Sequence, residues 1–293
     1  MEALALIKTQ GLTKKYKEFS AVDEVSMTIN KGDIYGFIGK NGAGKTTFIR
    51  LLVQLIKESS GNLIFGENDL KMGAVIEGPV CYPYLSAKEN LEYYAIQGGM
   101  KDKKRIKEVL KFVGLEDIPA EKKFKDYSLG MRQRLGIGLA ILNQPEFLIL
   151  DEPINGLDPQ GIVEIREIIF RLNKEFGTTI LISSHILSEL SLVANRYGII
   201  NKGKLIKELT KQELENECSQ SLVLKTSSNQ KARELLQMQG YDFKNMEDCI
   251  SIQTNQEEMA SIAKKLFENS IYITEFYIKE QNLEDYYLEI LGE

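Results

Sequence analysis

A glycine-rich run early in the chain has the composition and spacing of a phosphate-binding loop. It reads Gly39-Lys40-Asn41-Gly42-Ala43-Gly44-Lys45-Thr46, which fits the P-loop pattern. Glycines let backbone N–H groups close around phosphate oxygens, and we expect the Lys45 ammonium to contact the β- and γ-phosphates. The Thr46 hydroxyl is a predicted Mg²⁺ ligand, and the helix starting there adds positive potential. The residues predicted to bind nucleotide here are Gly39, Lys40, Asn41, Gly42, Ala43, Gly44, Lys45, Thr46 and Thr47.

Two acids close an apolar segment farther along the chain. Phe147–Leu150 predicts a buried strand, and Asp151 and Glu152 follow it directly. A carboxylate at the end of such a strand suits a Mg²⁺ ligand, the role predicted for Asp151. Glu152 is the predicted catalytic base, because a nearby carboxylate can accept the proton of the water that attacks the γ-phosphate. An ordinary solvated strand end is the alternative, and the preceding phosphate loop favours a nucleotide site.

The elements around these motifs alternate between strand and helix. Asp33–Gly39 predicts a buried strand before the loop, and Lys45–Ile56 predicts a helix after it. Further strands are predicted at Thr178–Ser183 and Tyr197–Asn201, with a helix at Gly161–Phe176 before them. This alternation favours a mostly parallel α/β sheet.

Two other regions differ from this pattern. Residues 86–142 are mainly helical in character, and Ser86 and Glu89 have the spacing of a capping box. We therefore predict a helical subdomain at about 84–143, inserted into a core domain of residues 1–210. After a polar segment, residues 219–293 predict a small α+β domain. Its expected strands are Ser221–Lys225, Asp248–Gln253 and Ile271–Ile278, and its expected helices are Asn229–Met238, Gln256–Phe267 and Leu283–Leu291.

Composition narrows the class of protein. Hydrophobic residues make up 43% of the 293 residues, which is typical of a folded globular chain. No apolar run approaches the roughly 20 residues of a membrane span, and residues 1–10 do not resemble a secretory signal. The three cysteines, Cys81, Cys218 and Cys249, are widely spaced, which suits reduced thiols inside the cell. A net charge of −5 gives no general attraction to nucleic acid, so we expect no nucleic-acid partner.

A phosphate loop with a following acidic strand also occurs in GTPases and small-molecule kinases. GTPases normally carry an Asn-Lys-x-Asp motif for guanine. The nearest run here is Asn201-Lys202-Gly203-Lys204, which lacks the carboxylate and argues against guanine specificity.

A third motif carries a family resemblance. Ser128-Leu129-Gly130-Met131-Arg132-Gln133 precedes the acidic strand and resembles the signature sequence of ABC ATPases, with Leu129 and Met131 in place of its usual residues. The resemblance covers roughly residues 4–208. It is reinforced by Asn155-Gly156-Leu157-Asp158 after the acids and by His185 after Ser183-Ser184. It implies a P-loop ABC-type ATPase fold with ATP and Mg²⁺ as cofactors.

The resemblance also implies roles for single residues. His185, the only histidine, matches the position that contacts the γ-phosphate, and Tyr16 matches the aromatic position that stacks on adenine. Ser128 and Gly130 are expected to act at the ATP site of a second subunit, so that two copies form a homodimer around ATP, and Asp158 is also expected to bind the cofactor. A structural histidine and an ordinary surface tyrosine are the alternatives.

One loop departs from the family pattern. ABC ATPases normally present a glutamine where this chain has Glu77, within Ala74-Val75-Ile76-Glu77-Gly78-Pro79. Glu77 is a candidate Mg²⁺ ligand, a group that repels the γ-phosphate until the site closes, or an exposed acid before a turn. This Glu variant, residues 82–91 and the ending from Asn282 onward resemble the bacitracin-resistance and lantibiotic-immunity branch of ABC exporters.

The predicted function is thus an ATP-hydrolysing subunit that powers a separate integral-membrane permease and exports antimicrobial peptides or similar amphiphiles. We expect it in the cytoplasm, held at the inner face of the membrane by the permease. The alternative is a soluble ABC-type switch that acts on ribosomes or nucleic acid. Members of that type usually carry two cassettes or a long coiled coil, which this chain lacks. An accessory module without turnover is a further alternative, and it would require the loss of Lys45 or Glu152.

Overall fold

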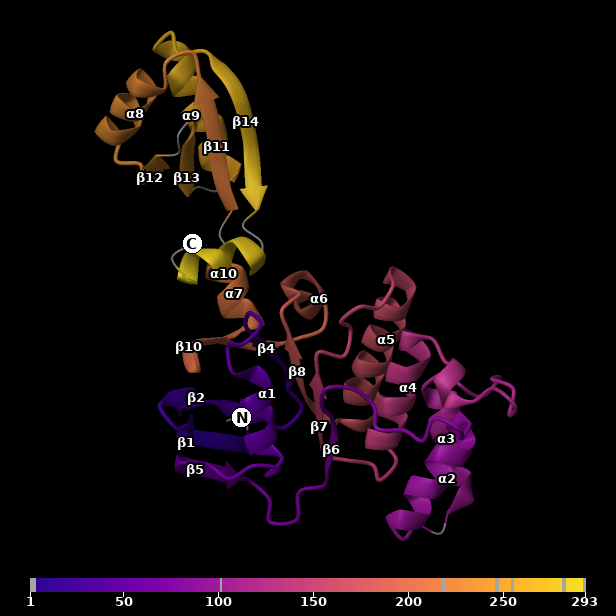
Figure 1. Cartoon of the computed structure of the whole chain (residues 1–293). Helices are drawn as coiled ribbons and strands as arrows, with labels where there is room; N and C mark the ends of the chain where they lie inside the picture. Colours follow the sequence, from indigo (N-terminus) through magenta and orange to yellow (C-terminus); the bar gives the residue numbers. More distant parts are fainter. Residues whose placement is uncertain are drawn as a thin grey trace. The chain divides into compact units, whose positions relative to one another are not determined.

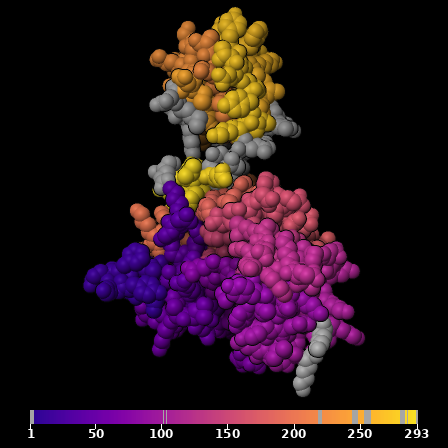
Figure 2. Space-filling model, turned by 45° about the vertical axis from the view of Figure 1, so that its right-hand side comes forward, coloured from indigo at the N-terminus to yellow at the C-terminus, as the bar shows by residue number. Residues whose placement is uncertain are grey.

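The chain forms two compact units, Met1–Lys211 and Gln212–Glu293, which Figures 1 and 2 colour by position in the sequence. This computed structural model describes residues 4–100, 102–217, 220–245, 248–253, 256–280 and 283–291. Cys218, residues 1–3 of the N-terminus, and Asn282 of the ending lie outside the described residues. The division of function predicted for residues 1–210 and 219–293 stays a prediction.

A six-stranded sheet organises the first unit, in the order β10-β9-β4-β8-β7-β6. Its strands are β10 (Lys204–Thr210), β9 (Arg196–Asn201), β4 (Ile34–Ile38), β8 (Thr179–Ser184), β7 (Phe147–Asp151) and β6 (Met72–Val75). All neighbours are parallel except β10, which runs antiparallel to β9. Every residue of β4, β7 and β8 is buried, as expected for strands covered on both faces. The predicted α/β class is confirmed.

A second sheet comes from the N-terminal residues. It contains β1 (Ala5–Tyr16), β2 (Phe19–Val25), β3 (Thr28–Asn30) and β5 (Ser60–Phe65), with β1 antiparallel to the other three. Helix α1 (Lys45–Leu52) contributes Phe48 and Leu52 to the apolar core that both sheets share. The predicted helix to Ile56 was too long, because α1 ends at Leu52 and Val53 caps it.

Helices fill the chain between β6 and β7. They are α2 (Ala87–Gln97), α3 (Lys103–Phe112), the short 3₁₀ turn Phe124–Asp126, and α4 (Leu129–Ala140). The predicted capping box is confirmed: Ser86 Oγ accepts from Glu89 N at 3.3 Å, and Ser86 N donates to the Glu89 carboxylate at 2.6 Å. Helix α5 (Pro159–Phe176) connects β7 to β8, and α6 (Leu187–Ser191) connects β8 to β9.

The second unit has a β-α-β-β-α-β order. Strands β11 (Gln220–Thr226), β12 (Phe243–Asn245), β13 (Ile250–Gln253) and β14 (Ile273–Glu280) alternate with helices α8 (Asn229–Met238) and α9 (Gln256–Glu268). The sheet is antiparallel in the order β12-β13-β11-β14. Its core joins Leu222 and Leu224 of β11 to Ala232 and Ile262 of the helices. Helices α7 (Lys211–Glu217) and α10 (Leu283–Leu291) lie at its two ends in the sequence.

Candidate functional site

The phosphate loop joins β4 to α1 and has a backbone that side chains would disturb. Gly42 and Gly44 have φ angles of 81° and 108°, in the region that favours glycine. A Cβ atom on Gly44 would lie 2.4 Å from the Ala21 carbonyl oxygen, and one on Gly39 would lie 2.7 Å from that of Ile200. The loop therefore needs glycine for both its conformation and its close packing.

Lys45 begins α1 and is buried at 6% exposure. Its Nζ donates to the carbonyl oxygens of Gly39 (2.5 Å) and Lys40 (3.3 Å). The same Nζ lies 3.0 Å from Glu152 Oε1. This oxygen is buried, and the ion pair with Lys45 compensates its charge. The ammonium is thus held over the loop, where it is positioned to meet an anion bound by the backbone N–H groups.

A cavity of about 400 Å³ opens at this loop. It is lined by Phe19, Ala21, Asn41, Gly42, Gly44, Lys45, Thr46, Thr47 and Glu152. Six of the residues predicted to hold the phosphates thus share one hollow with the predicted base. Among the other loop residues, Ala43 donates its N–H to the Lys40 carbonyl oxygen at 3.1 Å, which closes the turn.

Asp151 lies at the carboxyl end of β7 and is buried at 5% exposure. Its Oδ2 accepts from the Thr46 hydroxyl at 2.9 Å, and its Oδ1 accepts from the Ser183 hydroxyl at 2.5 Å. The structure therefore brings the two predicted Mg²⁺ ligands, from α1 and β7, together. A carboxylate and a hydroxyl are hard oxygen donors of the kind Mg²⁺ takes beside nucleotide phosphates. Among the described residues, no three His, Cys, Asp or Glu side chains gather as a metal site.

Glu152 follows with a left-handed backbone, at φ 50°. Its N–H lies 2.9 Å from Ser183 Oγ and 3.2 Å from the Ser183 carbonyl oxygen. Its carboxylate meets Lys45 through Oε1 and His185 Nδ1 through Oε2, the latter at 2.8 Å. A carboxylate held between a cation and an imidazole beside the phosphate loop can act as a base toward water.

Ser183 is a site residue for which the sequence predicted no role. Its hydroxyl lies fully buried between Asp151 and the Glu152 N–H. It therefore orients both acids at once. The only signal in the sequence was its place in the Ser183-Ser184-His185 run after a predicted strand.

The predicted signature residues lie at helix starts of the same unit. Ser128 Oγ accepts from Met131 N at 3.3 Å and caps α4, and Asp158 Oδ1 accepts from Gly161 N at 3.0 Å and caps α5. A Cβ on Gly130 would lie 3.9 Å from Leu157, so the two motifs are neighbours. None of Ser128, Gly130 and Asp158 lines the cavity at the phosphate loop of the same chain.

Tyr16 and Glu77 have other surroundings. Tyr16 is 47% exposed and pairs across the β1–β2 hairpin with Phe19, and the lining of the cavity includes Phe19 rather than Tyr16. Phe19 was not among the residues predicted from the sequence. Glu77 has a φ angle of 58°, and its carboxylate binds Arg50 Nη2 at 2.7 Å. The structure gives Glu77 no contact with Thr46 or Asp151.

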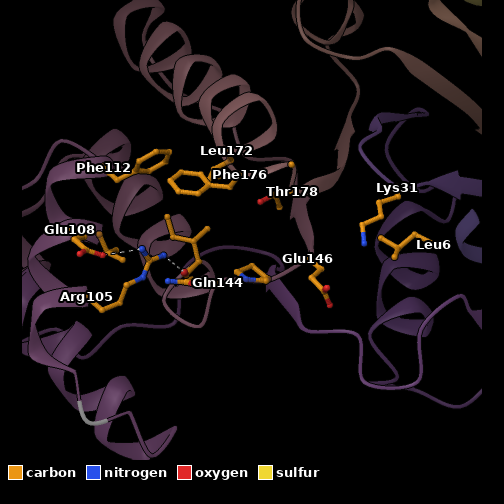
Figure 3. A pocket seen from close by; sticks show the side chains of 14 residues that line it. Leu6, Lys31, Arg105, Glu108, Phe112, Gln144, Glu146, Leu172, Phe176 and Thr178 are labelled. Carbon is orange, nitrogen blue, oxygen red and sulfur yellow. Dashed lines mark hydrogen bonds and ion pairs between the residues drawn. The ribbon is translucent and has the colours of Figure 1, made fainter. Parts of the chain in front are cut away.

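A larger cavity, of about 660 Å³, lies away from the phosphate loop (Figure 3). Pro145, Glu146 and Thr178 in its lining precede β7 and β8, so it lies at the opposite ends of the parallel strands from Asp151 and His185. Arg105 in its wall already donates to the carbonyl oxygens of Ile141 and Leu142. This cavity is therefore not the phosphate site.

Comparisons with known proteins agree with this geometry. The family described as "ABC transporter" matches residues 22–155. The chain is 42% identical to the bacitracin transport ATP-binding protein BcrA of Bacillus licheniformis, over 98% of this chain and 97% of that protein. It is 44% identical to the lantibiotic transport ATP-binding protein SrtF of Streptococcus pyogenes, over 69% of this chain and 90% of that protein.

The fold also has solved counterparts. The structure is similar to a dimeric ATP-binding cassette in a post-hydrolysis state bound to ADP and Pi. The TM-score is 0.63 with 27% identity, covering 70% of this chain and 98% of that one. The solved cassette covers 70% of this chain and SrtF covers 69%. Each match is about as long as the first unit, Met1–Lys211.

Proposed function

The chain belongs to the ABC transporter family of ATP-binding proteins, and we propose that it drives the export of antimicrobial peptides or similar amphiphiles through an integral-membrane permease. Its activity is that of an ATPase coupled to transport. The proposal about cargo is supported by relatives named for bacitracin and lantibiotic transport. No described helix has the length and apolar character to span a bilayer. We place the chain at the inner face of the membrane, held there by the permease.

One observation carries the hydrolytic part of this proposal. The Glu152 carboxylate contacts Lys45 and His185. The preceding residue, Asp151, accepts a hydrogen bond from the Thr46 hydroxyl. ATP phosphates bound in the loop would pair with the Lys45 ammonium in place of Glu152. The Glu152 carboxylate would then be free to accept a proton from water, and His185 would contact the γ-phosphate. Mg²⁺ held by Thr46 and Asp151 would neutralise phosphate charge.

The site in a single chain lacks the signature residues. Ser128 and Gly130 start α4, whose N-terminus offers positive potential to an anion. We propose that they complete the ATP site of a second copy, in a homodimer with ATP between the subunits. Tyr16 and Phe19 together form the aromatic end of the β1–β2 hairpin, and we propose that this end contacts adenine.

We propose an apolar groove of the first unit as the contact for the permease. The groove has a volume of about 440 Å³, and its lining includes Leu55, Gly78, Pro79, Val80 and Tyr94. Leu55 and Val80 are 67% and 78% exposed and share one groove, and apolar side chains gathered at one place on a surface mark an interaction site. Glu77 lies directly before this groove and binds Arg50 of α1. Movement of the permease can therefore reach the helix that carries Lys45 and Thr46.

Copurification and a resistance assay test this function together. The tagged chain is expressed with its candidate permease in a bacitracin-sensitive bacterium, and the minimal inhibitory concentrations of bacitracin and a lantibiotic are measured. We expect recovery of a polytopic membrane protein with the chain and higher minimal inhibitory concentrations than without it, since active export lowers the local peptide concentration. Val80→Asp should lose the membrane protein, and Ile64→Asp, at an exposed apolar site on β5, serves as the matched control. Recovery of ribosomes or nucleic acid instead would favour the soluble switch.

A further inference from the structure

Strand β14 is an outer strand of the second unit's sheet (Figure 1). It has eight residues, Ile273–Glu280, and pairs with β11 along one edge. Among the residues that the structure describes, no strand pairs with its other edge. A long outer strand presents backbone N–H and C=O groups that readily pair with another strand.

The side chains of β14 separate into two faces. Phe276 and Ile278 lie opposite Leu224 and Leu222 of β11 and are half-buried, and Phe276 packs against the apolar core. Glu275, Tyr277 and Lys279 alternate with them and are exposed. Tyr277 is 49% exposed. One face of β14 is therefore apolar. On its other face, Tyr277 lies between Glu275 and Lys279.

This pattern is complementary to itself. If two copies of β14 run antiparallel with Tyr277 opposite Tyr277, Glu275 lies opposite Lys279 twice and Phe276 lies opposite Ile278 twice. Moving the centre by half a step toward Ile278 sets Phe276 against Lys279, and moving it toward Phe276 sets Glu275 against Ile278. Of these three registers, only the one centred on Tyr277 pairs Glu275 with Lys279, and directly opposed charges and aromatic rings stabilise antiparallel strands.

We propose that β14 pairs with β14 of a second copy of this chain in the register centred on Tyr277. The axis of this pair is perpendicular to the sheet, so the two four-stranded sheets become one and the helices of both copies cover the same face. Such a contact is isologous and closes on itself. It gives two copies of the chain a contact in the C-terminal unit that needs neither ATP nor Lys45.

Cysteine crosslinking of the full chain tests the register. In a background with Cys81, Cys218 and Cys249 replaced by serine, Tyr277→Cys places two thiols directly opposite, with Cβ atoms about 5 Å apart. We expect a disulfide dimer under mild oxidation, with and without MgATP, and equally in the Lys45→Ala variant. Lys264→Cys on α9, where the side chain is 78% exposed, is the matched control. Crosslinking of Tyr277→Cys no faster than that of the control would overturn the proposal, as would its crosslinking to the permease instead.

Charge reversal tests the complementarity. Lys279→Glu should lower the rate of Tyr277→Cys crosslinking at least about tenfold, because each attractive pair becomes repulsive. Glu275→Lys should do the same, and Glu275→Lys combined with Lys279→Glu should restore crosslinking. Glu275 also lies 3.9 Å from Lys225 within one chain, so thermal melts verify that each variant is folded. Equal crosslinking in the single and double variants would contradict the register.

Discussion

Replacing Ser183 by alanine tests how the site holds its two acids. The change removes the hydroxyl that donates to Asp151 Oδ1 at 2.5 Å and accepts from Glu152 N at 2.9 Å. Ser183 is fully buried, so water cannot replace it at either group. The hydrogen bond to the charged Asp151 carboxylate contributes about 1.5–3 kcal/mol, whereas the Glu152 N–H keeps the Ser183 carbonyl oxygen at 3.2 Å as an acceptor. We therefore expect the free energy of unfolding to fall by about 1.5–3 kcal/mol, which corresponds to a Tm lower by roughly 3–12 °C for a unit of this size.

The same substitution should weaken the chemistry. Asp151 would keep Thr46 but lose its second partner, and groups that orient metal ligands typically contribute 10- to 100-fold to metal affinity or activity. We expect kcat to fall by about that factor and the Mg²⁺ concentration for half-maximal activity to rise. Phosphate release as a function of Mg²⁺ measures both effects.

A neighbouring serine provides the control. Ser184 is also fully buried, but its hydroxyl bonds to Ile186, with the Ile186 N–H donating at 2.9 Å. Ser184→Ala should therefore cost stability with little change in the Mg²⁺ dependence. If Ser183→Ala and Ser184→Ala show the same Mg²⁺ dependence, Ser183 does not position Asp151 and this part of the account is wrong.

Three further predictions concern separate parts of the chain. Lys45→Ala should lower kcat/KM for ATP at least about 100-fold while circular dichroism stays unchanged, and turnover at the wild-type rate would contradict its role. Removal of residues 212–293 should preserve basal hydrolysis, because the first unit has its own core and carries every predicted site residue, including those proposed to act on a second copy; a folded truncation without ATPase activity would show that the tail completes the site. Glu89 has a pKa lowered to about 2, by the Ser86 N–H and then by Lys123, so its stabilising effect should be present at neutral pH and lost as the pH falls from about 4.5 toward 2. The Tm difference between wild type and Glu89→Gln should shrink over that range, and a constant difference would argue against this linkage.

Local motifs predicted the chemistry better than the architecture around it. The phosphate loop is set by neighbouring residues, because glycines at 42 and 44 are needed for the positive φ angles of one short turn. The buried strands β4 and β7 are continuous apolar runs, which a reading of the sequence detects readily.

The missed elements have weaker local patterns. Strand β1 pairs with three other strands through register shifts and so lacks a regular alternation of buried residues. Strand β10 is an outer strand with one buried residue, Leu209. Its sequence was therefore interpreted as part of a polar segment. The role of Ser183 depends on Asp151, 32 positions away, and the Arg50 partner of Glu77 is 27 positions away. No local pattern signals such contacts.

The Glu152→Gln variant tests the central claim most directly, because the amide keeps the size of the carboxylate and removes its ability to accept a proton. Single-turnover hydrolysis and size-exclusion chromatography with MgATP are measured on the full chain. We predict that ATP still binds, that its hydrolysis slows at least about 100-fold, and that an ATP-bound dimer accumulates in a larger share than in the nucleotide-free variant. Hydrolysis at the wild-type rate, with no ATP-dependent change in the elution, would contradict the account.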